Sequence, residues 1–438
     1  MKKIFIIIIL AFISVAKLEA QSNLDFKKVN ELSLIYYYAS EWDSLINIGI
    51  AAESNDIDYY YLNYRMAIAF FYKENYFTST FYFEKSLKQN AKAIEDDFFR
   101  LIYYKAILFS KQNNKVLKIS QLQDTIFDIF PATYKGEVDV FYFKGKISRN
   151  LDNKQLRMTP GNIYSEIYYQ QNISMFGVGT SFLLDKNMGI DFRYSNAKLR
   201  MIAAIEDEEH FYIRNFDVQQ NTVNVKPSFY IGNSQRIDMF LGASFLNSNV
   251  FAPLDSSRNE YGFRNLQTFS FVVGLAYRYR FKNIDIGVNS VFSSFSNDKN
   301  IQIGASILWY PFGNLNLYSS TEVSAMNTTA NIPRLILYQE IGFKTINKLW
   351  VELSGYYGDV NNFSMITSNY SFEIANHTKG IASAKIIYTL SPSINLFANT
   401  QYWWRYTDKL EIQLNQEEQI KIINYQQINF IGGLEWKF

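Results

Sequence analysis

Residues 269–281 read FSFVVGLAYRYRF, and this stretch decides the fold class. Its odd positions, from Phe269 to Phe281, are all apolar or aromatic, whereas its even positions are small or basic and end in Arg278 and Arg280. Successive side chains of a strand point to opposite faces. One face of this strand is therefore apolar with aromatic side chains at its ends, and the other carries small or charged side chains. A strand of a membrane-spanning β-barrel has this pattern, with lipid on one side and the lumen on the other.

The same alternation recurs in 284–292 and 301–309, and less cleanly in 394–406. Six tight turns separate such segments, near 185–187, 232–235, 282–283, 311–314, 346–348 and 391–393. Between them run longer polar connections at 198–221, 249–264, 359–378 and 407–424, and short ones at 170–172, 297–299 and 327–332. Six turns join twelve strands, and a leading strand at 161–169 and a closing strand at 425–438 make fourteen.

The even count places both ends of the barrel on the side of the tight turns. Short periplasmic turns and long external loops are the asymmetry of outer-membrane barrels. We therefore predict an α+β chain: helices in the periplasm, followed over 161–438 by an antiparallel transmembrane β-barrel of about fourteen strands. A count of twelve or sixteen stays open. A soluble β-sandwich is disfavoured because its strands average about five or six residues.

The chain ends in INFIGGLEWKF, residues 428–438, where most alternate positions are apolar and the last residue is aromatic. This ending resembles the C-terminal signal that the outer-membrane assembly machinery reads. The resemblance assigns Leu434, Trp436 and Phe438 to that signal. It implies two partners, the barrel-assembly machinery and outer-membrane lipid.

The N-terminus carries the pattern of a secretory signal peptide. Lys2 and Lys3 precede a run of thirteen residues, 4–16, that is apolar apart from Ser14. This run is too short to cross about 30 Å of hydrocarbon as a helix. We predict that residues 1–20 form a signal peptide cleaved after Ala20, with Ala16 as a second candidate site and an uncleaved anchor as the alternative.

Apolar residues between 22 and 125 recur three and four positions apart, which is the spacing of helices. The segment 63–91 resembles a tetratricopeptide repeat, and the same pattern occurs 34 residues earlier, at the period of that repeat. In the two units Leu32, Ser33 and Tyr36 correspond to Met66, Ala67 and Phe70, and Trp42, Leu45 and Ala52 correspond to Tyr76, Ser79 and Ser86. Gly49 departs from the pattern, because the second unit has Phe83 at that position.

What the resemblance implies is a periplasmic domain over 22–125 with a concave surface for a protein partner. The partner-binding candidates are Tyr36, Trp42, Phe70, Tyr76 and Phe83. Because the repeats are few, a spacer role is equally open, and so is an unrelated helical bundle. Residues 126–160 contain Pro131 and Pro160 and have no clear period, so we expect a partly helical connector there.

Composition excludes several kinds of chemistry. The chain has no cysteine and two histidines, which leaves little for a metal site, and we expect no cofactor. The predicted signal peptide contains Lys2, Lys3, Lys17 and Glu19, so the mature chain has 40 basic (43 − 3) and 40 acidic (41 − 1) residues. This balance of charge does not indicate nucleic-acid binding. His210 and His377 fall in predicted external loops without the spacing of a catalytic triad. We predict that the protein is not an enzyme.

Charged residues on the predicted inner face are the candidate site. The lumen-facing candidates are Asp191, Arg193, Arg278, Arg280, Glu340, Glu352 and Glu435. They fit a network of ion pairs that fills the lumen, or a polar path for a solute. Eight strands leave a filled interior and sixteen to eighteen leave a channel, so a count of fourteen does not decide between them.

Two function classes follow. The first is a transport or export channel with a helical docking domain. Its domain order is similar to that of exopolysaccharide export porins, which have many more repeats. Fourteen strands are also typical of fatty-acid transporters, but the sequence shows no matching N-terminal hatch. The second is a non-conducting outer-membrane scaffold that binds a periplasmic protein through its helices.

Overall fold

The computed structural model describes residues 24–112, 114–115, 136–255, 260–295, 298–328, 333–365, 370–372, 376–415 and 417–438. The predicted signal peptide and the first part of the predicted connector, 126–135, lie outside these residues. The chain divides into two compact units, Met1–Ala106 and Ile107–Phe438.

The first unit is helical. Its elements are α2 (Phe26–Tyr38), α3 (Trp42–Glu53), α4 (Tyr60–Tyr72), α5 (Tyr76–Gln89), a 3₁₀ helix (Ala91–Glu95) and α6 (Asp97–Phe109), which ends just past its boundary. The starts of α2 and α4 are 34 residues apart (60 − 26), and so are those of α3 and α5 (76 − 42). Asp25 and Asn75 cap two of these helices by accepting hydrogen bonds from the backbone N–H groups of Lys28 and Thr78. A helical region thus precedes the barrel, as predicted; its membership of the tetratricopeptide repeats stays a prediction.

Aromatic packing explains where the partner-binding candidates lie. Trp42 stacks on Tyr72 and Phe70 stacks on Tyr82, with ring centroids 4.8 and 5.4 Å apart. Tyr36, Trp42, Phe70 and Tyr76 are half-buried. Phe83 is 0% exposed and packs against Phe99, Tyr103 and Tyr64. Phe83 is therefore a core residue with no surface for a partner, which corrects its assignment as a contact residue.

Gly49 departs from the repeat pattern for a steric reason. A Cβ atom at this position would lie 2.0 Å from the Sδ atom of Met66, which is itself buried. We expect Gly49→Leu to lower the stability of the helical unit by about 1–3 kcal/mol, because it overpacks a filled site. Thermal loss of helical circular dichroism measures this effect. Ile50→Leu, at an exposed position of the same helix, is the matched control, and an equal melting temperature for both variants would contradict the packing argument.

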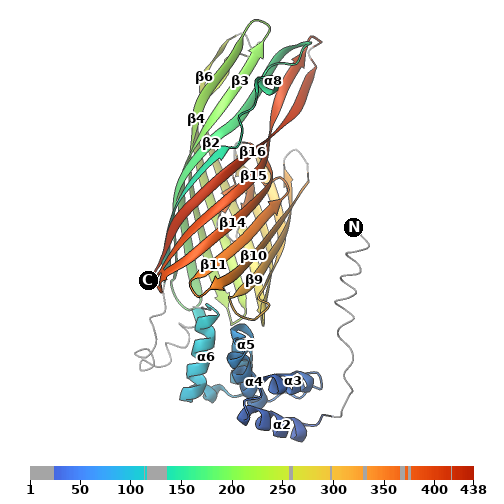
Figure 1. Cartoon of the computed structure of the whole chain (residues 1–438), viewed down its shortest axis with the longest axis vertical. Helices are drawn as coiled ribbons and strands as arrows, with labels where there is room; N and C mark the ends of the chain where they lie inside the picture. Colours follow the sequence, from blue (N-terminus) through green and yellow to red (C-terminus); the bar gives the residue numbers. More distant parts are fainter. Residues whose placement is uncertain are drawn as a thin grey trace. The chain divides into compact units, whose positions relative to one another are not determined.

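The second unit is a closed antiparallel barrel of fourteen strands (Figure 1). Its strands are β1 (Gly136–Ile147), β2 (Asn162–Leu183), β3 (Met188–Asp207), β4 (Phe211–Ile231), β5 (Gln235–Pro253), β6 (Tyr261–Phe281), β7 (Ile284–Phe295), β8 (Asp298–Trp309), β9 (Leu317–Thr328), β10 (Arg334–Ile346), β11 (Leu349–Tyr357), β14 (His377–Ser391), β15 (Ile394–Gln413) and β16 (Glu418–Lys437). A short helix, α8 (Asn153–Leu156), lies between β1 and β2, and the strands β12 (Phe363–Met365) and β13 (Tyr370–Phe372) form a separate two-stranded sheet.

The predicted count of fourteen is confirmed, but two of its boundaries were wrong. β1 lies inside the predicted connector, so the barrel begins at residue 136 rather than 161. The predicted break at 170–172 is a β-bulge within the single strand β2, where the register to β3 shifts between Gln170 and Asn172. One strand was therefore missed and another was divided in two.

The two ends of the barrel meet at the side of the tight turns, here called the turn end. β1 pairs with both β16 and β2, which closes the ring. Gly136 and Phe438 exchange two backbone hydrogen bonds of 3.1 and 3.0 Å. Closure leaves no sheet edge around the ring, so its backbone groups are paired without help from water.

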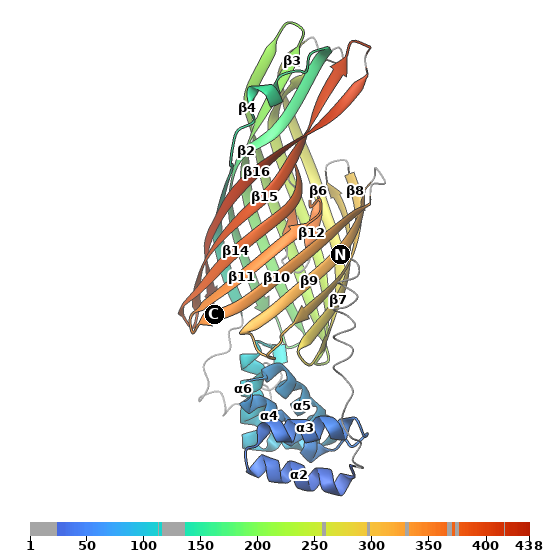
Figure 2. The same cartoon turned by 45° about the vertical axis from the view of Figure 1, so that its right-hand side comes forward.

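Seven strands extend beyond the others at the opposite end, here called the loop end (Figures 1 and 2). β2–β6, β15 and β16 have 19–22 residues, whereas β7–β10 have 12 or 13. The predicted long loops 198–221 and 407–424 are thus mainly paired strands. Beyond the end of β14, β15 pairs directly with β2, for instance through Lys409 and Ile167.

The outer surface of the ring is apolar. Leu275, Val288 and Ile303, on three neighbouring strands, are 54%, 54% and 62% exposed. Aromatic side chains gather on the outside near the turn end, where Tyr279, Phe281, Trp309, Tyr388, Trp436 and Phe438 are exposed. Trp436 and Phe438 of the predicted assembly signal therefore belong to the outer face of the closing strand, as does the half-buried Leu434.

Candidate functional site in the barrel interior

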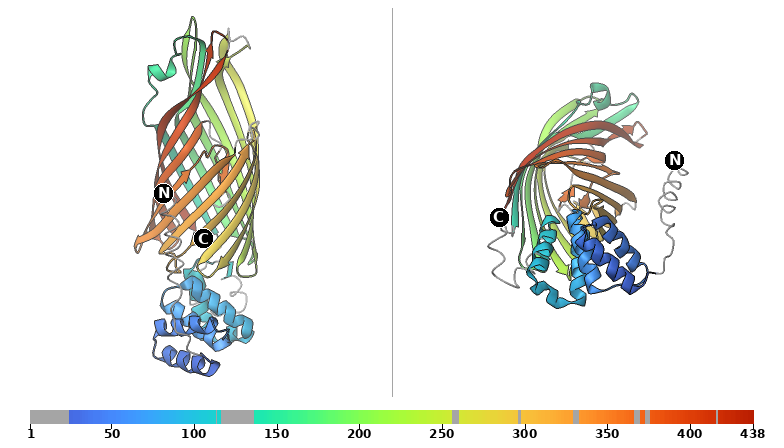
Figure 3. Two further views of the ribbon diagram at one scale, coloured as in Figure 1. Left: turned by 90° about the vertical axis from the view of Figure 1, so that its right-hand side faces the viewer. Right: turned by 60° about the horizontal axis from the view of Figure 1, so that its bottom comes forward.

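The alternation seen in the sequence separates the two faces of β6. Ser270 and Ala276 are 1% and 4% exposed and point inward, whereas Phe269 is 54% exposed and points outward. Figure 3 shows the wall of strands curving around the interior. Inward-facing side chains of all strands share this space, and those near the turn end form a charged layer.

The structure brings all seven lumen-facing candidates into the charged layer, each with a partner. Arg193 lies 3.0 Å from Asp139, Asp191 lies 2.8 Å from Lys226, and Arg280 contacts Asp285 through two pairs of atoms at 2.5 Å. Glu352 lies 2.9 Å from Lys385 and Glu435 lies 3.1 Å from Lys437. Glu340 accepts a hydrogen bond from Tyr338. Arg278 approaches Asp238 at 3.6 Å.

Asp238 is the centre of the most buried of these clusters. Its side chain is 0% exposed. It accepts hydrogen bonds from Arg236 at 2.5 Å and from Ser228 at 2.6 Å. Arg236 and Arg278 thus face one carboxylate. Such an arrangement compensates the desolvation of Asp238 and leaves a local excess of positive charge.

Part of the segment between β11 and β14 folds into the barrel toward its loop end. We call its described residues, 358–365, 370–372 and 376, the strap; the strap contains β12, which Figure 2 shows within the ring. Val360 and Phe363 of the strap are fully buried and belong to one apolar cluster with Ile336, Met326 and Ile381 of the barrel wall. The strap corrects our prediction that 359–378 is an external polar loop.

Side chains of the wall hold the first part of the strap. Gln302 of β8 makes two hydrogen bonds to the backbone of Ser364. Its side-chain nitrogen donates to the Ser364 carbonyl at 2.9 Å, and its side-chain oxygen accepts from the Ser364 N–H at 3.3 Å. Arg334 of β10 donates to the Asn361 carbonyl at 3.1 Å and lies 3.4 Å from Asp359. Two strands therefore fix the strap through hydrogen bonds.

The bulge of β2 holds the last residue of the strap. Gln170, at the bulge, donates its backbone N–H to the side-chain oxygen of Asn376 at 2.9 Å. Arg405 of β15 is 1% exposed and donates to the Asn376 carbonyl at 3.0 Å and to the side chains of Gln170 and Gln427 at 2.7 Å each. The bulge thus leaves the backbone N–H of Gln170 available, and Asn376 of the strap accepts a hydrogen bond from it.

His377 follows the strap and contacts its beginning. Its Nδ1 atom lies 2.9 Å from Asp359, which also accepts a hydrogen bond of 3.2 Å from Tyr406. The rings of His377 and Tyr406 stack with centroids 4.6 Å apart. His210, in contrast, is exposed beside Asp207. The two histidines are therefore in different surroundings, and His377 contributes to holding the strap.

Sequence reasoning missed Gln170, Gln302, Arg334 and Asn376 as functional candidates. The described residues contain no group of three or more His, Asp or Glu side chains placed to hold a metal ion. In the part of the chain that the structure describes, no helix has the length and apolarity needed to cross a membrane. The interior is thus a site of hydrogen bonds, ion pairs and apolar packing.

No protein-family model and no curated protein matches the sequence. Among solved structures, the chain is similar to the P. putida toluene transporter TodX, with 8% identity over 76% of this chain and 94% of that one and a TM-score of 0.45. It is also similar to a Pseudomonas aeruginosa FadL homologue, with 6% identity, coverages of 69% and 90% and a TM-score of 0.40. A bacterial polysaccharide outer membrane secretin matches with 8% identity, coverages of 70% and 100% and a TM-score of 0.37.

Proposed function

We propose that the second unit is an outer-membrane transport channel whose aperture is set by the strap. The observation that carries this proposal is the strap itself, a chain segment held inside a closed ring by polar side chains of the wall. Hydrogen bonds to water can replace each of these contacts when the strap moves. The barrel then has a defined closed state and a route to an open one.

The outer surface supports a location in a membrane. A water-soluble protein rarely exposes a large continuous apolar surface such as the one that Leu275, Val288 and Ile303 share. Strands of 12 residues, rising about 3.3 Å each at a tilt of about 45°, span roughly 28 Å, close to the apolar band of outer-membrane barrels. Short turns face the periplasm in such barrels. The helical unit precedes β1 at the turn end and would therefore be periplasmic.

The interior supports conduction over a purely anchoring role. A barrel that serves only as an anchor gains stability from an apolar filling, because each buried ion pair carries a desolvation cost. Here the wall near the turn end carries paired charges from Asp139 on β1 to Lys437 on β16. Such side chains can stay paired and become hydrated when water enters.

Single-channel recording of the mature protein in planar bilayers tests the proposal. We expect brief openings for the wild type and an increase of roughly tenfold in open probability for Gln302→Ala, because two hydrogen bonds to the strap are lost. Gln267→Ala, at an exposed position of β6, is the matched control and should behave as wild type. A silent bilayer for both the wild type and Gln302→Ala would overturn the channel and favour the non-conducting scaffold.

A second role concerns the helical unit, which would dock a periplasmic protein. Its exposed aromatic side chains favour this role: Phe26, Tyr38, Tyr61 and Tyr72 are all more than half exposed. Photo-crosslinking from position 61 of the full chain in cells should capture one discrete partner. A crosslinker at Lys88, a polar position on α5, serves as the control. The same products from both positions would contradict a specific docking surface.

A further inference from the structure

Five neighbouring strands, β4–β8, carry an uncharged polar surface on the inside of the barrel. We call it the polar wall; its members are Gln220, Thr222, Asn224, Ser244, Ser270, Ser293, Asn300 and Gln302. The register connects them around the ring. Asn224 pairs with Gly242, Gly242 with Val272, Val272 with Ser293 and Ser293 with Asn300. The polar wall is thus one band of amides and hydroxyls around this part of the ring, interrupted by the buried apolar side chains of Val272, Val291 and Phe295.

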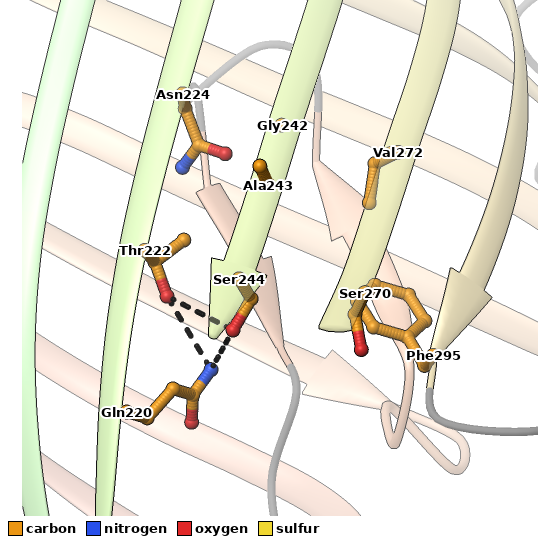
Figure 4. A pocket seen from close by; sticks show the side chains of 9 residues that line it. All are labelled: Gln220, Thr222, Asn224, Gly242, Ala243, Ser244, Ser270, Val272 and Phe295. Atoms are coloured by element: carbon orange, nitrogen blue, oxygen red, sulfur yellow. Dashed lines mark hydrogen bonds between the residues drawn. The ribbon is translucent and has the colours of Figure 1, made fainter. Parts of the chain in front are cut away.

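A recess lies in the polar wall, with room for about one water molecule (Figure 4). Gln220 donates to Ser244 at 3.0 Å on one side of it, and Phe295 and Val272 line the other. Gly242 keeps the recess open, because a Cβ atom there would lie 2.6 Å from the side-chain oxygen of Asn224. Polar groups therefore sit beside a small apolar surface.

Asn300 gives the polar wall an unused donor and an unused acceptor. Its side chain is 1% exposed, and neither its amide nitrogen nor its amide oxygen has a hydrogen-bond partner. Buried polar groups are normally hydrogen-bonded, so a side chain with both ends unpaired indicates a missing ligand or water. Asn300 lies directly across from Ser293 and two residues before Gln302, which holds the strap. The unpaired amide thus adjoins the segment that has to move for passage.

The chemistry of these groups selects a class of solute. An ion at the polar wall would lose hydration without meeting an opposite charge, which is costly. A hydrocarbon would cover amides and hydroxyls and leave them unpaired. A hydroxyl group both donates and accepts, so several hydroxyls on one small molecule match Asn300, Ser293 and their neighbours. The apolar side chains of Val272 and Phe295 suit the C–H face of a sugar ring.

The strap lies beside the polar wall. Gln302 joins the polar wall to Ser364, and Val360 and Phe363 pack on an apolar cluster that includes residues of the neighbouring β9, β10 and β14. We propose that the polar wall is the solute-recognising surface of the channel and that its solute is a small, neutral, polyhydroxylated molecule. This inference rests on the proposed channel function.

Liposome swelling with the mature full chain tests this inference, with glucose, gluconate and glucosamine as neutral, anionic and cationic probes of similar size. We expect glucose to enter fastest through the wild type. Asn300→Leu should slow glucose roughly five- to tenfold, because two hydrogen bonds are lost, and should leave gluconate entry nearly unchanged. Asn327→Leu, the same change at an exposed position of the neighbouring β9, is the matched control. Heat-modifiable gel mobility reports whether each variant folds.

Asn300→Asp provides a second test, since it places a carboxylate in the polar wall. We expect it to shift the preference from glucose to glucosamine. Equal entry of glucose and gluconate through the wild type, or an equal loss of both in Asn300→Leu, would overturn the assignment of the solute. In either case ionic current in the same preparation would leave the channel standing. The absence of any ionic current would overturn the channel and this inference together.

Discussion

Asp238→Asn is expected to destabilise the barrel by about 3–5 kcal/mol and to make the channel strongly anion-selective. The substitution removes a carboxylate that is 0% exposed and lies 2.5 Å from Arg236 and 3.6 Å from Arg278. The two half-buried guanidinium groups then lose the attraction of this carboxylate. Denaturant unfolding followed by gel mobility measures the first effect, and the reversal potential in a salt gradient measures the second.

Asp217→Asn is the matched control for this prediction. Asp217 is on β4, pairs with Arg200 at 3.2 Å and is largely exposed. An exposed ion pair contributes about 0–1 kcal/mol, so this variant should keep the stability and selectivity of the wild type. If Asp238→Asn were as stable and as selective as Asp217→Asn, the charged layer near the turn end would have no role in either property.

Arg405→Met is expected to release the last residue of the strap. The guanidinium group joins Asn376, Gln170 and Gln427 through three hydrogen bonds of 2.7–3.0 Å. Hydrogen bonds to charged groups contribute about 1.5–3 kcal/mol each, so the loss of these three exceeds the loss of the two uncharged hydrogen bonds of Gln302. We expect channels that stay open for most of a recording, with a larger effect than that of Gln302→Ala.

Arg264→Met, at an exposed position of β6, controls for the loss of a positive charge. Limited proteolysis of the purified protein gives a second measurement, because a released strap becomes a substrate for added protease. Wild-type gating together with an intact strap in Arg405→Met would show that Arg405 stabilises the barrel without holding the strap.

The parts of the barrel with one lipid-facing and one polar face could be predicted from the sequence. In residues 269–281 of β6 the odd positions are exposed and the even positions are buried or half-buried, because only the outer face has to match an apolar environment. β1 escaped prediction because apolar side chains occur on both of its faces: Phe141 and Phe143, next to the inward-facing Asp139, point into the apolar cluster of the interior, and Tyr142 points outward. The extension of β3 was missed for the same reason, since residues 201–205 are buried on both faces and show no alternation.

The candidate site was predictable only in its charged layer, where alternation alone assigns residues to the lumen. The strap depends on contacts between distant parts of the chain: Gln170 and Asn376 are 206 residues apart, and Gln170 and Arg405 are 235 apart. The polar tripeptide at 170–172 has the composition of a turn. Its role as a bulge becomes evident only from the contact of Gln170 with Asn376. Likewise, nothing local distinguishes Gln302 from the other polar residues of the inner face.

The chain has no cysteine, so two introduced cysteines can be crosslinked without side reactions. Gln302→Cys combined with Ser364→Cys, joined by a short reducible thiol crosslinker, fixes the strap to β8 in the position seen here. Single-channel recording before and after reduction then shows whether release of the strap opens the channel. We expect a silent channel while the crosslink is intact and frequent openings after reduction. Equal currents in the two states, or none in either, would contradict gating by the strap.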